Sequence, residues 1–230
     1  MGEGGEPSKQ ACRYRLASGA RITRRSRKGC SNLDQHIANV RAFGITPVVA
    51  INAFAEDSKE EMEEVRARAI QAGAAAAVVC THWAEGGRGA EDLARAVVEA
   101  CRQPSAYAPL YEDAASIKQK ISTVATGLYG AKAVVYDQEA DAQIEHATRL
   151  GYGSMPVCMA KSPLSLSHDS ALKGRPKGFT LPVKQLKILA GAGFVTAVCS
   201  GVQLMPGLPS KPALERIEVD PLSGEIVGLS

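Results

Sequence analysis

The sequence is poor in aromatic residues and lacks the features of several common protein classes. Only 5% of its 230 residues are aromatic, and there is one Trp. Its six cysteines include no C-x-x-C pair, which argues against a disulfide framework or a zinc site and favours a reducing compartment. The apolar runs are short, so none is expected to span a bilayer. Because 45% of the residues are hydrophobic, disorder over the whole chain is excluded.

The motifs of nucleotide and nucleophile chemistry are also missing. No G-x-x-x-x-G-K-[ST] occurs, although residues 127–132 and 174–180 contain the right residue types at the wrong spacing. Residues 191–193 lack the third glycine of a dinucleotide loop and predict a turn. No two of the four histidines have metal-ligand spacing, so no bound metal or prosthetic group is expected. The sequence has no G-x-S-x-G nucleophile elbow. A catalytic Ser-His-Asp triad formed by Ser165 or Ser167 with His168 and Asp169 is therefore disfavoured.

Charge is distributed unevenly along the chain. Residues 1–28 contain eight basic and two acidic residues, whereas residues 29–230 contain 19 basic and 22 acidic ones. The first segment has no periodic apolar face, so we expect a basic, disordered leader. An organelle transit peptide is the alternative, since the segment is rich in Arg and Ser and poor in acids. The mildly acidic remainder offers no basic patch for nucleic acid.

Helix and strand patterns alternate over residues 29–104, which we expect to form a partial α/β domain. The apolar spacing of Leu33, Ile37 and Val40 predicts a helix that ends at Gly44. Residues 45–51 and 75–80 are continuous apolar runs of the kind found in buried parallel strands. Between them Ser58-Lys59-Glu60-Glu61 forms a capping box, and a further helix places Leu93, Val97 and Cys101 on one face.

This alternation predicts a doubly wound, mainly parallel sheet with ligands bound beyond the carboxyl ends of its strands. Residues 105–230 are expected to form a smaller mixed α/β region. The helices predicted there cover residues 117–128 and 137–150, and the strands cover residues 155–160, 179–183 and 194–199. A hairpin is predicted around residues 220–224, between two short apolar runs.

Two of the few aromatic residues follow the two predicted parallel strands. Phe54 comes shortly after the first strand, and Trp83 comes shortly after the second. If these strands are neighbours, both rings overhang one crevice, where a flat heteroaromatic ligand could stack between them. The alternative is that both rings pack as core against the helix ends. From position alone the two interpretations are about equally supported.

The segment that begins at Trp83 is rich in glycine and precedes a predicted helix. Its glycines allow backbone N–H groups to approach an anion or the edge of a substrate, and the helix start adds a partial positive charge. Glycines also serve ordinary turns, so the loop alone is weak evidence. Asn52 and Asp57 invite comparison with the base-reading Asn-x-x-Asp of P-loop proteins, at a longer spacing. The candidate substrate or anion residues are Asn52, Glu85, Gly86, Gly87 and Gly89.

Several segments together resemble the formate–tetrahydrofolate ligase family. They occur in the same order in the chain and cover it from about residue 29 to its end: Asn52-Ala53-Phe54, Cys80-Thr81-His82-Trp83-Ala84-Glu85-Gly86-Gly87, Pro156-Val157-Cys158-Met159-Ala160-Lys161, Leu166-Ser167-His168, Gly178-Phe179-Thr180-Leu181-Pro182 and Met205-Pro206-Gly207-Leu208-Pro209. The resemblance implies ATP-dependent ligation of formate to tetrahydrofolate through formyl phosphate, giving 10-formyltetrahydrofolate. It further implies a P-loop-NTPase-like sheet and a pteridine ring stacked between two aromatic residues, at the positions of Phe54 and Trp83.

The resemblance also sets the expected substrates and partners. Tetrahydrofolate and ATP with magnesium are substrates of the intact enzyme, which is expected to be a cytoplasmic homo-oligomer; a mitochondrial or plastid location is the alternative. No nucleic acid or membrane partner is expected. The family's P-loop and its formyl-phosphate residues lie in an amino-terminal part that residues 1–28 do not resemble, so no catalytic residue can be assigned. We therefore expect an inactive fragment, or alternatively a non-catalytic folate-binding or regulatory subunit that pairs with intact ligase.

Overall fold

The computed structural model describes residues 22–55, 57–199, 210–224 and 226–228, without the side chains of residues 22–28 and 213. The chain divides into two compact units. Of the described residues, 22–199 belong to the first unit and 210–228 belong to the second. The domain boundary expected near residue 104 lies inside the first of these units.

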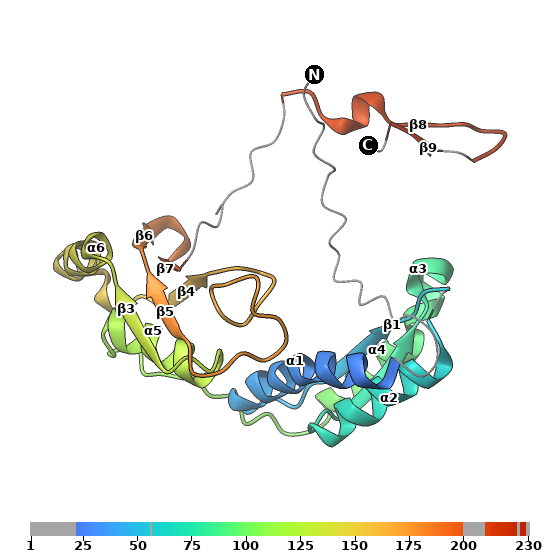
Figure 1. The fold of residues 1–230 in the computed structure, drawn as a ribbon, viewed down its shortest axis with the longest axis horizontal. Coiled ribbons are helices and arrows are strands. Elements are labelled where there is room, and N and C mark those ends of the chain that lie inside the picture. Colours follow the sequence, from blue (N-terminus) through green and yellow to red (C-terminus); the bar gives the residue numbers. More distant parts are fainter. Residues whose placement is uncertain (1–21, 56, 200–209, 225, 229–230) are drawn as a thin grey trace. The chain divides into compact units, whose positions relative to one another are not determined.

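The first part of the larger unit alternates helices with two parallel strands (Figure 1). Strands β1 and β2 pair in parallel, with Val48 opposite Ala76 and Asn52 opposite Cys80. The strand–helix–strand alternation predicted for this region is therefore confirmed. The elements are α1 (Ile22–Ala42), β1 (Val48–Asn52), α2 (Lys59–Gln71), β2 (Ala76–Cys80), α3 (His82–Glu85), the 3₁₀ turn η1 (Gly86–Ala90) and α4 (Glu91–Cys101).

Helix α1 begins at Ile22, so it includes residues 22–28 of the segment expected to be a disordered leader. Arg and Lys are good helix formers, which is why a basic segment can continue a helix without an apolar face of its own. Residues 1–21 lie outside the described residues. The helix ends as predicted before Gly44, where φ is +73°. A Cβ at this glycine would also lie 1.9 Å from the Ala106 carbonyl oxygen, so both conformation and space require glycine.

Helix α2 begins with the predicted capping box and completes the first core. The Ser58 hydroxyl accepts a hydrogen bond from the Glu61 N–H, and the Glu61 carboxylate accepts one from the Ser58 N–H. These bonds satisfy two N–H groups at the helix start. Helix α2 packs on α1 and on the strands β1 and β2. The buried core residues are Ile37, Ile51, Ala69, Ala74 and Ala77.

The second part of the larger unit contains three more strand pairings. Strand β3 pairs in parallel with β5, and β4 pairs in parallel with β7, which pairs antiparallel with β6. The predicted turn at residues 191–193 joins β6 to β7. Strands β3 and β6 were not predicted. The elements are α5 (Ile117–Gly127), β3 (Ala133–Tyr136), α6 (Gln138–Arg149), η2 (Tyr152–Ser154), β4 (Val157–Ala160), β5 (Thr180–Val183), β6 (Gln185–Leu189), η3 (Ala190–Ala192) and β7 (Phe194–Val198).

A buried lysine links α5 to the segment that enters β4. Lys120 has an exposed fraction of 0%. Its Nζ donates hydrogen bonds to the carbonyl oxygens of Ser154 and Met155, at 2.7 and 3.1 Å. Burial lowers the pKa of this ammonium, while Asp113 opposes that shift. Lys120 therefore fixes the chain just before β4.

The smaller unit contains η4 (Ala213–Arg216), β8 (Glu218–Val219) and β9 (Ile226–Val227). The two strands pair antiparallel, so the predicted hairpin is confirmed. The Asp220 side chain accepts hydrogen bonds from the N–H groups of Leu222 and Ser223 and thereby shapes the loop.

The chain is a mixed α/β protein with small parallel and mixed sheets, which agrees with the predicted class. Within the described residues the strands form four separate sheets, ordered β1–β2, β3–β5, β4–β7–β6 and β8–β9. The single doubly wound sheet of a P-loop-NTPase-like fold is therefore not confirmed. Alternating patterns predict parallel pairs but do not specify how many pairs join into one sheet.

Candidate functional site

The candidate site lies at the carboxyl ends of β1 and β2. Because the two strands are parallel and Asn52 is opposite Cys80, both strands end at the same edge of the sheet. The Ala53 N–H continues the ladder by donating to the Cys80 carbonyl oxygen at 2.9 Å. The loops that carry the candidate residues therefore start from adjacent points. Asn52 is exposed at the end of its strand.

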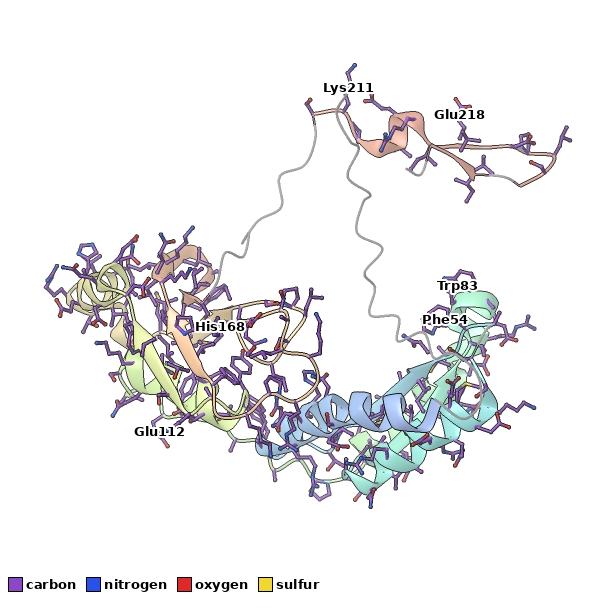
Figure 2. All side chains as sticks on the ribbon, in the orientation of Figure 1. Phe54, Trp83, Glu112, His168, Lys211 and Glu218 are labelled. Carbon is purple, nitrogen blue, oxygen red and sulfur yellow. The ribbon has the colours of Figure 1, made fainter. Side chains whose placement is uncertain are left out.

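Phe54 and Trp83 lie next to each other beyond these strand ends (Figure 2). Their ring centroids are 6.0 Å apart and their planes are inclined by 60°. Phe54 is 46% exposed and Trp83 is 77% exposed, so neither ring belongs to a hydrophobic core in this structure. The proximity predicted from the strand ends is observed. Two adjacent, solvent-facing aromatic rings form a surface on which a flat ligand can stack.

The backbone that carries Phe54 is held by Asp57. The Asp57 carboxylate accepts a hydrogen bond from the Phe54 N–H at 2.8 Å, and the Asp57 N–H donates to the Phe54 carbonyl oxygen at 3.0 Å. This tight turn fixes where the phenyl ring leaves the backbone. One carboxylate oxygen of Asp57 is engaged within its own loop, so the structure gives this residue a role in positioning Phe54.

Trp83 lies on the short helix α3, which is held by hydrogen bonds to Thr81, the residue that directly follows β2. The Thr81 hydroxyl donates to the Glu85 carboxylate at 2.7 Å, and the Ala84 and Glu85 N–H groups both donate to the Thr81 carbonyl oxygen. Glu85 therefore has one carboxylate oxygen engaged and remains exposed. These bonds close one turn around Trp83, whose side chain is largely exposed.

The glycines of the loop have different roles. A Cβ on Gly89 would lie 2.4 Å from the Thr81 carbonyl carbon, and the Gly89 carbonyl oxygen accepts from the Thr81 N–H at 3.0 Å. Close packing therefore accounts for Gly89. A Cβ on Gly86 or Gly87 would instead meet no heavy atom within 4 Å, and Gly86 has φ +59°. These two glycines leave the backbone accessible to a ligand edge.

An anion at the start of α4 is disfavoured. The 3₁₀ turn η1 separates Glu85 from α4, and the first turn of α4 contains Glu91 and Asp92. These carboxylates interact favourably with the positive end of the helix and repel a second negative charge. Binding of an anion or of a substrate edge by the open glycines stays a prediction.

A second group of polar residues follows β4 and β7. Lys161 Nζ donates to the carbonyl oxygens of Ser162 and Ser165 and lies 4.8 Å from the centre of the Tyr129 ring. Burial lowers the pKa of Lys161, raises that of Tyr129 to about 12, and raises that of Cys199 to about 12. This lysine holds the turn after β4 in place. The structure thus gives it a structural role that the sequence alone did not indicate.

The serine and histidine residues in this region do not form a triad. The Ser165 hydroxyl lies 2.9 Å from that of Ser167 and donates to the Leu172 carbonyl oxygen. The His168 Nδ1 is buried and has no hydrogen-bond partner within the described residues. The Asp169 carboxylate accepts from the Ala171 N–H. The expectation against a nucleophilic triad agrees with this geometry.

The remaining features of the described residues concern metal binding, membranes and cavities. No three His, Cys, Asp or Glu residues come together there in a way that could hold a metal ion. None of the described helices is both long enough and apolar enough to cross a membrane. A broad hollow of about 1180 Å³ lies along α2 and is lined by Cys30 and by both charged and uncharged residues of that helix. It does not include the aromatic pair.

Comparison with known proteins relates this geometry to one family. The family model described as formate–tetrahydrofolate ligase matches residues 18–230. The chain is 48% identical over 203 residues to a formate–tetrahydrofolate ligase of Cereibacter sphaeroides, a match that covers 88% of this chain and 36% of that protein. It is 46% identical over 202 residues to the cytoplasmic C-1-tetrahydrofolate synthase of Drosophila melanogaster, covering 88% of this chain and 21% of the relative. The chain thus spans about a third of the length of the bacterial ligase it matches.

Proposed function

Because the chain belongs to the formate–tetrahydrofolate ligase family, we propose that it supplies the folate-binding part of such an enzyme. The observation that carries this proposal is the exposed pair of Phe54 and Trp83 at the ends of neighbouring parallel strands. The pteridine ring of tetrahydrofolate stacks on this pair. Its polar edge lies along the open backbone at Gly86 and Gly87, with Asn52 and Glu85 as candidate hydrogen-bonding groups.

The geometry of the pair defines what binding requires. A ring sandwiched between two others needs about 7 Å between the outer rings, since each stacked layer is about 3.5 Å thick. The two centroids are 6.0 Å apart and the rings are tilted. One of the two side chains, Phe54 or Trp83, therefore rotates when the ligand binds. The contact between the two rings is then replaced by a contact of each ring with the ligand. Both side chains are exposed enough for this rotation.

The proposed reaction of the whole enzyme joins formate to tetrahydrofolate at the expense of ATP. Formate takes the terminal phosphoryl group of ATP, giving formyl phosphate and ADP. The N10 atom of tetrahydrofolate then attacks the formyl carbon, the bond from that carbon to the phosphate oxygen breaks, and the N10 proton is lost. No residue of this chain is assigned to phosphoryl transfer, because its sequence contains no P-loop motif. We propose a cytoplasmic location on the basis of the named Drosophila relative.

Quenching of fluorescence by tetrahydrofolate tests the proposal, because Trp83 is the single tryptophan of the chain. Titration of the unmodified chain is expected to quench this emission with saturation. Phe54→Ala should weaken binding by about 1–3 kcal/mol, roughly 5- to 150-fold in Kd, the usual range for one aromatic stacking partner. Tyr107→Ala is the matched control, since Tyr107 is exposed but stacks on Phe43 instead. No saturable quenching would contradict the proposal.

A second candidate is a non-catalytic subunit that binds folate and pairs with intact ligase. It shares the exposed aromatic pair with the first candidate and differs from it in requiring an intact ligase as partner. Under both candidates the purified chain should form no ADP from ATP, formate and tetrahydrofolate. Co-purification of the tagged chain with an intact ligase would favour the second candidate, whereas measurable turnover by the chain alone would contradict both.

A further inference from the structure

Residues 82–88, the segment that carries Trp83, are held in place without core packing. Neither α3 nor η1 contains a buried residue, and Trp83 itself is 77% exposed. Helix α3 has only four residues, which is too short for a helix to be stable in water on its own. Apolar contacts therefore contribute little to the position of the indole ring, and hydrogen bonds determine where the segment lies.

Thr81 is bonded to both ends of this segment. The Thr81 N–H donates to the Gly89 carbonyl oxygen at 3.0 Å, which closes the segment at its base. The Thr81 carbonyl oxygen accepts from the N–H groups of Ala84 and Glu85, both at 2.9 Å. Its hydroxyl donates to the Glu85 carboxylate at 2.7 Å. The backbone and the side chain of one residue thus engage the turn around Trp83 from several directions.

Thr81 also lies next to the backbone that carries the other aromatic ring. It directly follows Cys80, the last residue of β2, whose carbonyl oxygen accepts from the Ala53 N–H at 2.9 Å. Ala53 is followed at once by Phe54. The loops that bear Phe54 and Trp83 therefore meet at two adjacent residues. A change in the turn at Thr81 alters the separation of the two rings directly.

The hydroxyl bond is the part of this network that depends on the Thr81 side chain. The backbone bonds of Thr81 use only peptide groups, so other residues could make them as well. The bond to Glu85 needs a hydroxyl at this position, and it spans the turn that contains Trp83. Because its acceptor is a carboxylate, the bond is stronger than one between neutral groups. The Thr81 hydroxyl therefore restricts this turn in a way that the backbone alone does not.

We propose that Thr81 is a positioning residue for folate binding, an inference that rests on the proposed function. Its hydroxyl holds the Glu85 carboxylate and thereby keeps the turn that carries Trp83 beside Phe54 before the ligand arrives. Ordering the segment in advance lowers the entropy that binding would otherwise cost. These bonds hold the backbone of the segment, so the Trp83 side chain can still rotate when the ligand enters.

Thr81→Val tests the proposal, because it removes the hydroxyl and keeps the branched shape of the side chain. In the ligand-free chain, time-resolved fluorescence anisotropy of Trp83, the single tryptophan, should show larger nanosecond motion in this variant. The Kd for tetrahydrofolate, measured by quenching of the same emission, should rise roughly 3- to 10-fold, as expected for one exposed hydrogen bond. Thr81→Ser keeps the hydroxyl and should match the unmodified chain in both measurements. Thr123→Val is the matched control, because the Thr123 hydroxyl donates to the Gln119 carbonyl oxygen within α5.

A double variant shows whether Thr81 acts through Glu85. Thr81→Val should add nothing to Glu85→Ala, so the double variant and Glu85→Ala should share one Kd. Additive losses, unchanged anisotropy in Thr81→Val, or a weakening that Thr81→Ser shows equally would each overturn the proposal. Tetrahydrofolate binding that Thr81→Val leaves unchanged would contradict this inference alone. No binding by the unmodified chain would contradict the proposed function, and the anisotropy of the ligand-free chain would still decide whether Thr81 orders Trp83.

Discussion

The Lys120→Met variant is expected to lower the free energy of unfolding by about 2–4 kcal/mol. Methionine keeps the length of the side chain but removes the donor that bonds the Ser154 and Met155 carbonyl oxygens. Two carbonyls that lose a partner cost about 1–3 kcal/mol each. Removing the ammonium also removes the cost of burying a charge, which offsets part of that loss. The net change is still a large share of the 5–15 kcal/mol typical of a domain.

Urea unfolding followed by circular dichroism measures this difference. Lys132→Met is the matched control, because Lys132 is exposed and the same substitution there should change stability by less than about 0.5 kcal/mol. In the Lys120→Met variant, hydrogen exchange should also accelerate at Val157, the first residue of β4. Equal stability of the two variants would refute the idea that the buried ammonium fixes the entry to β4.

Three further predictions concern other elements of the fold. Ser58→Ala should destabilise the protein by about 1 kcal/mol through loss of the α2 cap, measured by the same unfolding assay. Iodoacetamide at pH 8 should label the exposed Cys101 well before Cys199, whose pKa burial raises to about 12, as mass spectrometry can show. Hydrogen bonds from backbone N–H groups, first that of Ser223, lower the pKa of Asp220 below 3.8. The hairpin loop should therefore be stabilised above pH 3.8 and loosen as the pH falls through the lowered pKa, which NMR amide shifts would detect.

Local signals in the sequence were sufficient for most helices and strands. The capping box at Ser58 and the end of the helix before Gly44 follow from residue chemistry, and both are observed. Strand β3 has only four residues, too few to stand out from their surroundings. Strand β6 alternates apolar with polar residues at Gln185 and Lys187, which is a strand signal, but a short one that the prediction missed. The number of strands in each sheet depends on contacts between distant segments. Such contacts leave no periodic signal in the chain.

The candidate site was predictable to the extent that it depends on strand ends. Parallel pairing of two successive strands was enough to place Phe54 and Trp83 side by side. Their exposure was not predictable, because an aromatic residue at a strand end can pack on a helix equally well. The packing role of Gly89 was also not predictable, because the sequence does not distinguish a glycine required by a close contact from one that faces a ligand. Pteridine binding itself stays a prediction.

Calorimetric titration of tetrahydrofolate into the unmodified chain and the Trp83→Ala variant tests the central claim most directly. Trp83 is 77% exposed, so the substitution should leave the stability of the fold nearly unchanged and act on binding alone. The account predicts a Kd that is roughly 5- to 150-fold higher in the variant, from the loss of one stacking partner. Equal dissociation constants for the two proteins would contradict the assignment of this aromatic pair to folate binding.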